Sequence, residues 1–266
     1  MLTMDSFFDL SDCPFADLFT SCPYPWEPLK KLKEHMALCT SPIFHHLCLT
    51  DGVPLPSPYI FFNGKLRNAR ECIISYGDIT RGGLSVWENG QILEGASVIM
   101  AGAVLVGRNI NIGKGVLIES GALIKAPAII GDYSEIRQGA YLRGHCLIGK
   151  RCVVGHTTEC KHSIFFNDAK AGHFAYLGDS ILGNNVNLGA GTKCANLRFL
   201  PGNVVVKTLA GSIDSGLRKL GAIMGDNTQT GCNAVTSPGT LMKPACILMP
   251  NTTAASGLYG ENTVIR

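Results

Sequence analysis

The residues best suited to chemistry in this 266-residue sequence lie close together, between positions 143 and 198. His173 stands near the start of the segment GHFAYLGDSILGNNVNLGAGTKCANLR, and Tyr176, Asn187 and Asn196 follow it. An imidazole with an unperturbed pKa of about 6.5 suits a general base that takes a proton from an amine near neutral pH. The grouping predicts a catalytic site at His173. A hydrogen-bonded structural histidine is the alternative, and either asparagine alone would be structural.

Two cations, Arg143 and Lys161, precede this segment and are separated by three six-residue units. A phosphate needs converging cations, and arginine supplies a bidentate fork where lysine supplies a mobile point charge. The pair therefore predicts a phosphate site. The alternative is a solvated basic ladder, such as Lys150 and Arg151 would supply at a turn.

These residues lie in or beside a run of six-residue units, or hexads, that extends from residue 88 to residue 171. Typical units are IGKGVL (112–117), IESGAL (118–123) and LRGHCL (142–147), in which a bulky aliphatic comes first and a small residue often follows. Each unit is a short strand plus a turn that cannot bury its apolar position alone, so units must stack coil on coil around a continuous core. The period predicts an all-β solenoid.

The pattern is interrupted twice, and both breaks lie between residues 172 and 221. The hexad is lost at GHFAYLGDSI, returns at residue 182, is interrupted again over 196–221, and then runs from residue 224 to residue 253. Alternation of Val204, Val206 and Thr208 before Ala210 and Gly211 predicts a β-hairpin in the second break, with its turn at Ala210-Gly211. Loops that leave a rigid repeat often carry function. We therefore expect the site beside this inserted loop.

Residues 1–87 do not show the hexad. Residues 1–50 predict a helical arm with one helix from about Pro25 to Ala37, whose apolar face includes Trp26, and a shorter helix around Phe15. The arm would act as a lid or a docking surface. Residues 51–87 predict irregular strands and the first imperfect coils, and 88–266 the solenoid domain. Three histidines, His45, His46 and His156, are interpreted as structural.

Composition fits this fold and narrows the function. The chain is 46% hydrophobic and 16% charged with 31 glycines, which suits a solenoid with tight turns. A net charge of +3 and the lack of basic runs predict no nucleic-acid partner, and no apolar run is long enough for a membrane helix. Eleven scattered cysteines without a secretion signal predict a reducing cytoplasm. Cys160 is interpreted as a core residue.

The hexads resemble those of the hexapeptide-repeat acyltransferases. Segment 172–198, with AYLRGH (140–145) and VGHTTECKHS (154–163) before it, resembles the acetyltransferase half of the bifunctional UDP-N-acetylglucosamine pyrophosphorylase/glucosamine-1-phosphate acetyltransferases, and SGLRKLGAIMGDN (215–227) is similar to the archaeal sugar-1-phosphate nucleotidyltransferase/acetyltransferases. The resemblance implies a left-handed parallel β-helix with three hexads per coil. It also implies a homotrimer with sites between subunits.

The resemblance also implies roles for individual residues. It implies an enzyme that N-acetylates an amino-sugar 1-phosphate, most simply glucosamine 1-phosphate, on the route to UDP-N-acetylglucosamine. Acetyl-coenzyme A would be the co-substrate, and His173 would be the catalytic base. The substrate-binding residues it implies are Arg143, Lys161, Tyr176, Asn187 and Asn196. The residues implied on the acetyl-coenzyme A side are Ala190, Cys232 and Met249.

The sequence departs from these relatives in places that leave alternatives open. The 266 residues contain no Gly-rich nucleotide loop like that of their nucleotidyltransferase domain, and Leu197 stands where the bacterial enzymes have tyrosine. Cys232 stands where they have serine, and Met249 where they have alanine. The alternatives are an acyltransferase with another donor or a nucleotide-sugar acceptor, and a non-catalytic trimeric scaffold that binds through the Trp26 helix.

No metal site is predicted. One branch of this fold binds zinc through three histidines, but the spacing from His145 to His162 is one residue short of three hexads, as is that from His156 to His173. With coils of three full hexads neither pair would be in register.

Overall fold

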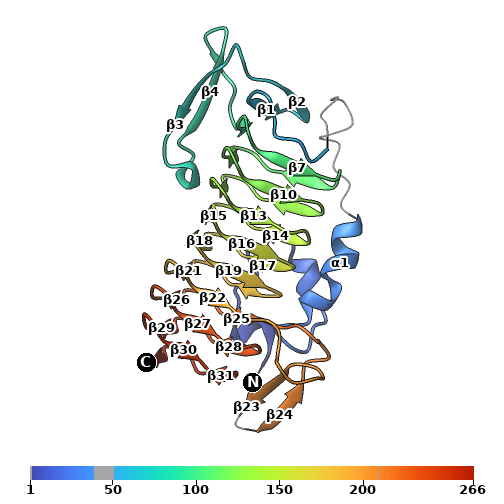
Figure 1. Ribbon diagram of the computed structural model, residues 1–266, viewed down its shortest axis with the longest axis vertical. Coiled ribbons are helices and arrows are strands. Elements are labelled where there is room, and N and C mark those ends of the chain that lie inside the picture. Colours follow the sequence, from blue (N-terminus) through green and yellow to red (C-terminus); the bar gives the residue numbers. More distant parts are fainter. Residues whose placement is uncertain (1, 39–50, 209) are drawn as a thin grey trace.

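The computed structural model describes residues 2–38, 51–208 and 210–266, and two of the histidines interpreted as structural, His45 and His46, lie outside them. In the described chain the repeat winds into a solenoid whose faces are three parallel sheets (Figure 1). The predicted all-β solenoid with a short helical N-terminal segment is confirmed.

Each coil adds one short strand to each sheet. Sheet 1 contains β6 (Ser97–Ile99), β9 (Leu117–Ile118), β12 (Glu135–Ile136), β15 (Val153–His156), β18 (Lys170–His173), β21 (Asn187–Leu188), β26 (Gln229–Thr230), β29 (Ile247–Leu248) and β32 (Val264–Ile265). Sheet 2 contains β7 (Val104–Val106), β10 (Leu123–Lys125), β13 (Tyr141–Leu142), β16 (Glu159–Lys161), β19 (Tyr176–Gly178), β22 (Lys193–Cys194), β27 (Val235–Thr236) and β30 (Thr253–Ala254). Sheet 3 contains β8 (Ile110–Ile112), β11 (Ala128–Ile130), β14 (Cys146–Ile148), β17 (Ser163–Phe165), β20 (Ile181–Leu182), β25 (Ala222–Met224), β28 (Thr240–Met242) and β31 (Gly257–Tyr259).

The core is a column of apolar side chains inside the coils. Ile118, Ile136 and Val154 belong to successive strands of sheet 1 and are fully buried in it. Cys160 also lies in this core, as predicted, and burial raises the pKa of its thiol well above the usual value. Cys160 is therefore a small apolar residue of the fold rather than a nucleophile.

Two successive coils are each one residue shorter than three hexads. Glu135 pairs with Val153, three full hexads later, whereas Val153 pairs with Lys170, one residue sooner than three hexads. The strand pairing continues past this point, since His156 pairs with His173.

Leu142 pairs with Cys160, 18 residues later, but Cys146 pairs with Ser163, only 17 later, so the first residue is lost between Cys160 and Ser163. The following coil is equally short, since Ile164 pairs with Ile181. The prediction of unbroken hexads up to residue 171 is therefore wrong, although the ladder of sheet 1 stays intact.

The second interruption is an insertion. Asn187 pairs with Gln229 as the next residue in the ladder, so the extra residues leave the solenoid between β22 and β25 and return. They include the predicted hairpin, with β23 (Val205–Thr208) antiparallel to β24 (Gly211–Asp214). The predicted turn at Ala210-Gly211 is one residue too late, because Gly211 already pairs with Thr208 in the second strand.

The N-terminal segment packs on its own solenoid. It contains η1 (Met4–Ser6), η2 (Ala16–Phe19) and α1 (Pro28–Leu38), which lie along one side of the coils (Figure 1). Phe8, Phe15 and Phe19 surround Phe166, with the ring of Phe8 stacked on it at 4.8 Å between centroids. Trp26 is fully buried in the same cluster, which covers the outer face of sheet 3. The prediction of a lid or docking arm that binds through Trp26 is therefore wrong, because the solenoid itself occupies that apolar face.

Residues 51–87 are antiparallel hairpins, so the prediction of imperfect first coils is wrong. The hairpin of β1 (Tyr59–Phe62) and β2 (Lys65–Asn68) pairs with β6 and extends sheet 1 at its end. A second hairpin, β3 (Ile73–Tyr76) and β4 (Leu84–Glu88), is continued by β5 (Gln91–Ile92). Its connection carries η3 (Ile79–Arg81), and Ile79 is buried in one cluster with Val98 and Leu117. The second hairpin therefore lies over the outer face of sheet 1 and extends down the coils (Figure 1).

In the described ranges no helix is both long enough and apolar enough to span a membrane.

Replacement of Phe166 with alanine tests how the arm is held. Phe166 is fully buried among three arm phenylalanines, so Phe166→Ala should lower the free energy of unfolding by about 3–5 kcal/mol and expose residues 2–38 to proteases. Phe199→Ala is the control, since Phe199 is fully exposed and should change stability by less than about 0.5 kcal/mol. Denaturant titration measures both values. Equal stability of the two variants would contradict the packing described.

Candidate active site

The predicted site residues fall into two groups on either side of one corner of the solenoid. His173 ends β18 in sheet 1, and Tyr176 begins β19 in sheet 2. Between them Phe174 adopts a left-handed backbone with φ 52° and is 54% exposed. The sharp corner turns the chain from one sheet to the next, so the two groups lie on adjacent faces.

The first group lines a groove of about 550 Å³. His173, Asn187, Ala190 and Cys232 all contribute to it. The floor is the outer face of sheet 1, and the opposite wall is the tip of the β3–β4 hairpin, residues 77–80. The groove therefore brings together four of the predicted residues from three successive coils, and adds a wall from a segment that lacks the repeat.

His173 is the exposed histidine of this groove, and its ring makes no hydrogen bond to the described part of the chain. His156 lies beside it in register on the neighbouring coil, but the Nδ1 atom of His156 is 3.0 Å from the carbonyl oxygen of Gln138. The fold thus occupies one nitrogen of His156 and leaves the ring of His173 available for proton transfer.

Met249 does not line this groove. The N–H of Asn233 donates to Ala190 O and the N–H of Asn251 donates to Cys232 O, so Pro250 takes the position that follows Ala190 and Cys232 in the stack. Met249 is 39% exposed one residue earlier. Its assignment to the acetyl-coenzyme A side stays a prediction.

The second group contains the two predicted cations, and the fold places them on adjacent coils. Tyr141 pairs with Glu159 and Leu142 with Cys160, so Arg143 follows in register with Lys161, as expected. We predicted a phosphate site from these two converging cations, but each cation already has a carboxylate beside it. The Nη1 atom of Arg143 is 2.6 Å from Glu159 Oε1, and Lys161 Nζ is 3.6 Å from Asp179 Oδ2. Charge repulsion in the free protein therefore does not require an anion.

Asp179 connects several of these side chains. Its carboxylate accepts a hydrogen bond from Asn196 Nδ2 and one from His162 Nδ1, at 2.9 Å for the histidine. Burial by itself would raise the pKa of Asp179, but the bonds from His162 and Asn196 and the charge of Lys161 outweigh it, so the pKa lies below the usual value. Asp179 is therefore an anion in the neutral pH range, held in the wall of the site.

Tyr176 and Asn196 approach each other over Gly178. A Cβ atom at Gly178 would lie 2.7 Å from the Tyr176 hydroxyl and closer still to the Asn196 amide nitrogen. Burial and the charges of Glu159 and Asp179 raise the pKa of Tyr176, so its hydroxyl stays protonated. The missing side chain at Gly178 thus lets a phenol and an amide share the space beside Lys161.

Sequence reasoning missed three residues of this site. Lys125 lies one coil before Arg143, and its Nζ is 5.4 Å from the centre of the Tyr141 ring, which Arg143 also approaches at 5.9 Å. The regular spacing of positions 125, 143 and 161 could have revealed it. Asp179 had no such signal, and Asp78 in the groove wall comes from a hairpin without any repeat.

The sequence argument against a metal site assumed that neither histidine pair would be in register, and this assumption is wrong. Both histidine pairs fall where a coil is one residue short of three hexads, so His156 pairs with His173, and the rings of His145 and His162 are 6.0 Å apart. In the described ranges no group of three or more histidine, cysteine, aspartate or glutamate side chains is arranged to hold a metal ion.

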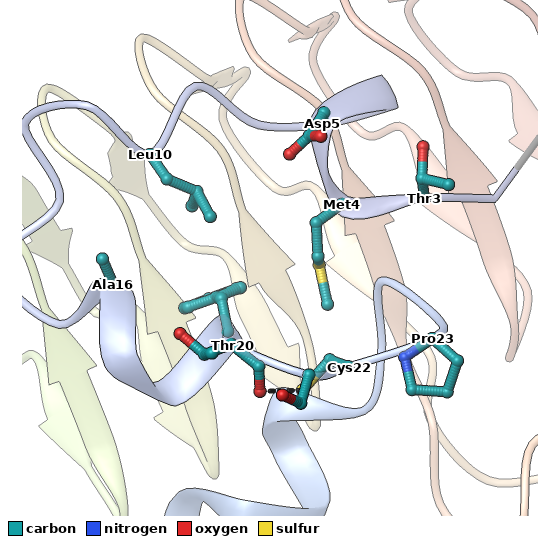
Figure 2. Close-up of a pocket in the computed structure, with 10 residues that line it drawn as sticks. Thr3, Met4, Asp5, Leu10, Ala16, Thr20, Cys22 and Pro23 are labelled. Atoms are coloured by element: carbon teal, nitrogen blue, oxygen red, sulfur yellow. Dashed lines mark hydrogen bonds between the residues drawn. The ribbon is translucent and has the colours of Figure 1, made fainter.

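A second hollow, of about 610 Å³, lies in the N-terminal segment. Figure 2 shows the side chains of Met4, Leu10 and Cys22 gathered around it. Of the described residues that line it, none is a lysine, arginine or histidine. Those lining residues therefore offer no cationic side chain to a phosphate.

Comparison with known proteins supports the class that the repeat and the site residues define, that of the hexapeptide-repeat acyltransferases. The family model described as the GMPPB C-terminal domain matches residues 124–211. The resemblance inferred from the hexads and from residues 172–198 is confirmed.

Two relatives show which members of that class the chain is similar to. It is 36% identical over 123 residues to the bifunctional sugar-1-phosphate nucleotidylyltransferase/acetyltransferase of Sulfurisphaera tokodaii, a match that covers 46% of this chain and 31% of the relative. It is 40% identical over 107 residues to the bifunctional protein GlmU of Methanocaldococcus jannaschii, covering 40% and 26%. The chain thus spans about a third or less of the length of these relatives. Among solved structures, the UDP-N-acetylglucosamine acyltransferase of Francisella novicida is 15% identical with a TM-score of 0.43, over 59% of this chain and 58% of that one.

The charge on Asp179 should appear in the stability of the protein. Its pKa is lower in the folded chain than the ordinary 3.8, so the stabilisation is complete above about pH 4 and is lost as pH falls through the folded pKa. Asp179→Asn should therefore cost about 1–3 kcal/mol at pH 7, and the difference from the wild type should shrink below pH 4. Urea unfolding at several pH values measures this. A difference that is constant with pH would contradict the ionised network.

Proposed function

We propose that this chain is an N-acetyltransferase that transfers the acetyl group of acetyl-coenzyme A to the amine of an amino-sugar 1-phosphate, with glucosamine 1-phosphate as the acceptor. The observation that supports it most is the ring of His173, which lies without a hydrogen bond to the described chain in a groove with Asn187, one corner away from Tyr176, Asn196 and the cations. The name of the Sulfurisphaera tokodaii relative includes an acetyltransferase activity. We further propose a cytoplasmic homotrimer that acts in UDP-N-acetylglucosamine biosynthesis.

The chemistry needs a neutral amine, a base and a stabilised oxyanion. The amine nitrogen attacks the thioester carbonyl carbon, the C–N bond forms, and His173 accepts the proton that the nitrogen loses. The C–S bond then breaks, and the proton held by His173 neutralises the departing thiolate of coenzyme A. Direct transfer needs no covalent enzyme intermediate, in keeping with the buried thiol of Cys160. Ala190 and Cys232 would border the acetyl group from the same groove.

The acceptor phosphate would bind at the ladder of Lys125, Arg143 and Lys161. With Glu159 and Asp179 these side chains carry a net charge of +1 when His162 is neutral. The Arg143–Glu159 pair is exposed by 42% and 34%, and such pairs are worth at most about 1 kcal/mol. A phosphate dianion can therefore displace Glu159 from Arg143, whereas the buried Asp179 keeps its partners.

Lys125 also favours a second candidate, in which the acceptor is a nucleotide amino sugar. The ladder extends one coil beyond Arg143, so a diphosphate could contact three cations. Leu197 and Cys232 are both exposed and differ from the residues of the bacterial enzymes, which suits another acceptor or acyl donor. Comparison of amino-sugar phosphates, nucleotide amino sugars and acyl donors by thiol release would separate the candidates.

Thiol release from acetyl-coenzyme A with glucosamine 1-phosphate tests the proposed base. His173→Ala should lower kcat by about 10²–10⁴-fold with unchanged melting temperature, because the proton acceptor is gone. His156→Ala is the matched control, since this ring lies in register on the preceding coil but its Nδ1 atom is hydrogen-bonded to the carbonyl oxygen of Gln138. It should keep most of the activity. A fully active His173→Ala would refute the assignment of the base.

Two glycine substitutions test the acceptor side. Gly178→Ala places a methyl group against Asn196 and Tyr176, whose side chains can swing away, so the fold should persist while the KM for the acceptor rises about tenfold. Gly260→Ala is the control, because a Cβ atom there would make only an ordinary contact, 3.7 Å from Thr263 Oγ1, and Gly260 does not line the groove. Initial rates at varied acceptor concentration give both KM values. If they are equal, Tyr176 and Asn196 do not contact the acceptor.

A further inference from the structure

Asp179 lies at the centre of the acceptor side, although neither the motif nor the proposed chemistry assigns it a role. Three groups converge on its two carboxylate oxygens: Asn196 Nδ2 and His162 Nδ1 donate hydrogen bonds, and Lys161 Nζ forms an ion pair at 3.6 Å. Two of these three are predicted substrate residues. Only 9% of the Asp179 side chain is exposed, so the charge is largely removed from water.

The backbone fixes Asp179 as firmly as the side chain. Its N–H donates to Lys161 O at 3.0 Å, and its carbonyl oxygen accepts from Gly221 N at 2.8 Å, where the inserted loop rejoins the solenoid. The residue has φ 48°, in the left-handed region that a non-glycine residue adopts at some cost. The carboxylate therefore has little freedom, and the side chains that donate to it are oriented by it rather than the reverse.

This arrangement determines what Asn196 and Lys161 can offer to a ligand. The amide NH₂ of Asn196 donates to Asp179, so its carbonyl oxygen points in another direction. That oxygen can accept a hydrogen bond from a hydroxyl or amine of the bound sugar. Lys161 has three donor hydrogens and uses Asp179 for one direction only, which leaves donors for an anion. Without the carboxylate the amide could rotate by half a turn, and Lys161 would lose its anchor.

We propose that Asp179 is a positioning residue for the acceptor: it fixes the orientation of the Asn196 amide and holds Lys161 toward the phosphate. This inference rests on the proposed function and deepens it, since it names the group that prepares the acceptor site before substrate arrives. Side chains that are already held in place lose less freedom when a ligand binds. Loss of Asp179 should therefore mainly weaken the affinity for the acceptor substrate.

Asp179→Asn tests this, with Asp168→Asn as the matched control. Asp168 also has a left-handed backbone, with φ 63°, and pairs with Arg151 at 2.7 Å on another side of the coil. In thiol-release assays Asp179→Asn should raise the KM for glucosamine 1-phosphate tenfold or more, with a smaller change in kcat and no change in the KM for acetyl-coenzyme A. The control should leave all three constants unchanged.

A double-mutant cycle separates positioning from general damage. If Asp179 acts through Asn196, then Asp179→Asn should add little to the KM increase of Asn196→Ala, because the amide it orients is already absent. Full additivity, an unchanged acceptor KM, or equal increases in both KM values would overturn the proposal. Should Asp179→Asn fail to fold, Asp179→Ser keeps an acceptor oxygen without the charge and takes its place.

Failure of the proposed function would be seen separately. If the wild type releases no thiol, the acetyltransferase proposal fails, and titration calorimetry with glucosamine 1-phosphate then decides the role of Asp179. Binding to the wild type that is at least tenfold weaker in Asp179→Asn would support positioning. Equal binding, or none to the wild type, would overturn it.

Discussion

The structure depends on the parallel hydrogen-bond ladders that join each coil to the next. Those ladders require that one inward apolar side chain of each strand stack on its neighbour, and they fix which outward residues stand side by side. They tolerate a coil that is one residue short of three hexads, provided the lost residue comes from a corner, as between Val153 and Lys170. Register, rather than sequence spacing, therefore decides which polar side chains meet, and the candidate site lies where that spacing changes.

Electrostatics in the site follows from the same stacking. Columns of outward residues place Lys125, Arg143 and Lys161 on successive coils, where like charges would repel one another. The fold offsets this with Glu159 and Asp179, one exposed and one buried. An exposed carboxylate can be exchanged for a ligand anion at little cost, but a buried one with two hydrogen bonds and an ion pair cannot. Glu159 is therefore a carboxylate that a ligand anion can replace at Arg143, whereas Asp179 keeps its contacts when a ligand binds.

The sequence predicted the solenoid, the burial of Cys160 and the inserted hairpin because each rests on a local pattern: a period of six, a small apolar residue in phase, and strand alternation around a turn. It did not predict that the Trp26 face packs on sheet 3 or that the β3–β4 hairpin walls the groove, since both are contacts between segments distant in the chain without a shared repeat. The histidine register failed for a different reason. A constant coil of three full hexads was assumed up to residue 171, whereas the first residue is lost between Cys160 and Ser163, inside the run that was interpreted as unbroken.

The measurement that tests the account most directly is the ratio of kcat/KM for glucosamine 1-phosphate to that for glucosamine, with acetyl-coenzyme A as donor. Both acceptors present the same amine to His173, but only the first has a phosphate for the cation ladder. We expect the phosphorylated acceptor to be preferred by about 100-fold or more, as befits a charge-assisted contact with two or three cations. Equal values for the two acceptors, or thiol release with neither, would contradict the assignment of the ladder and the groove to one active site.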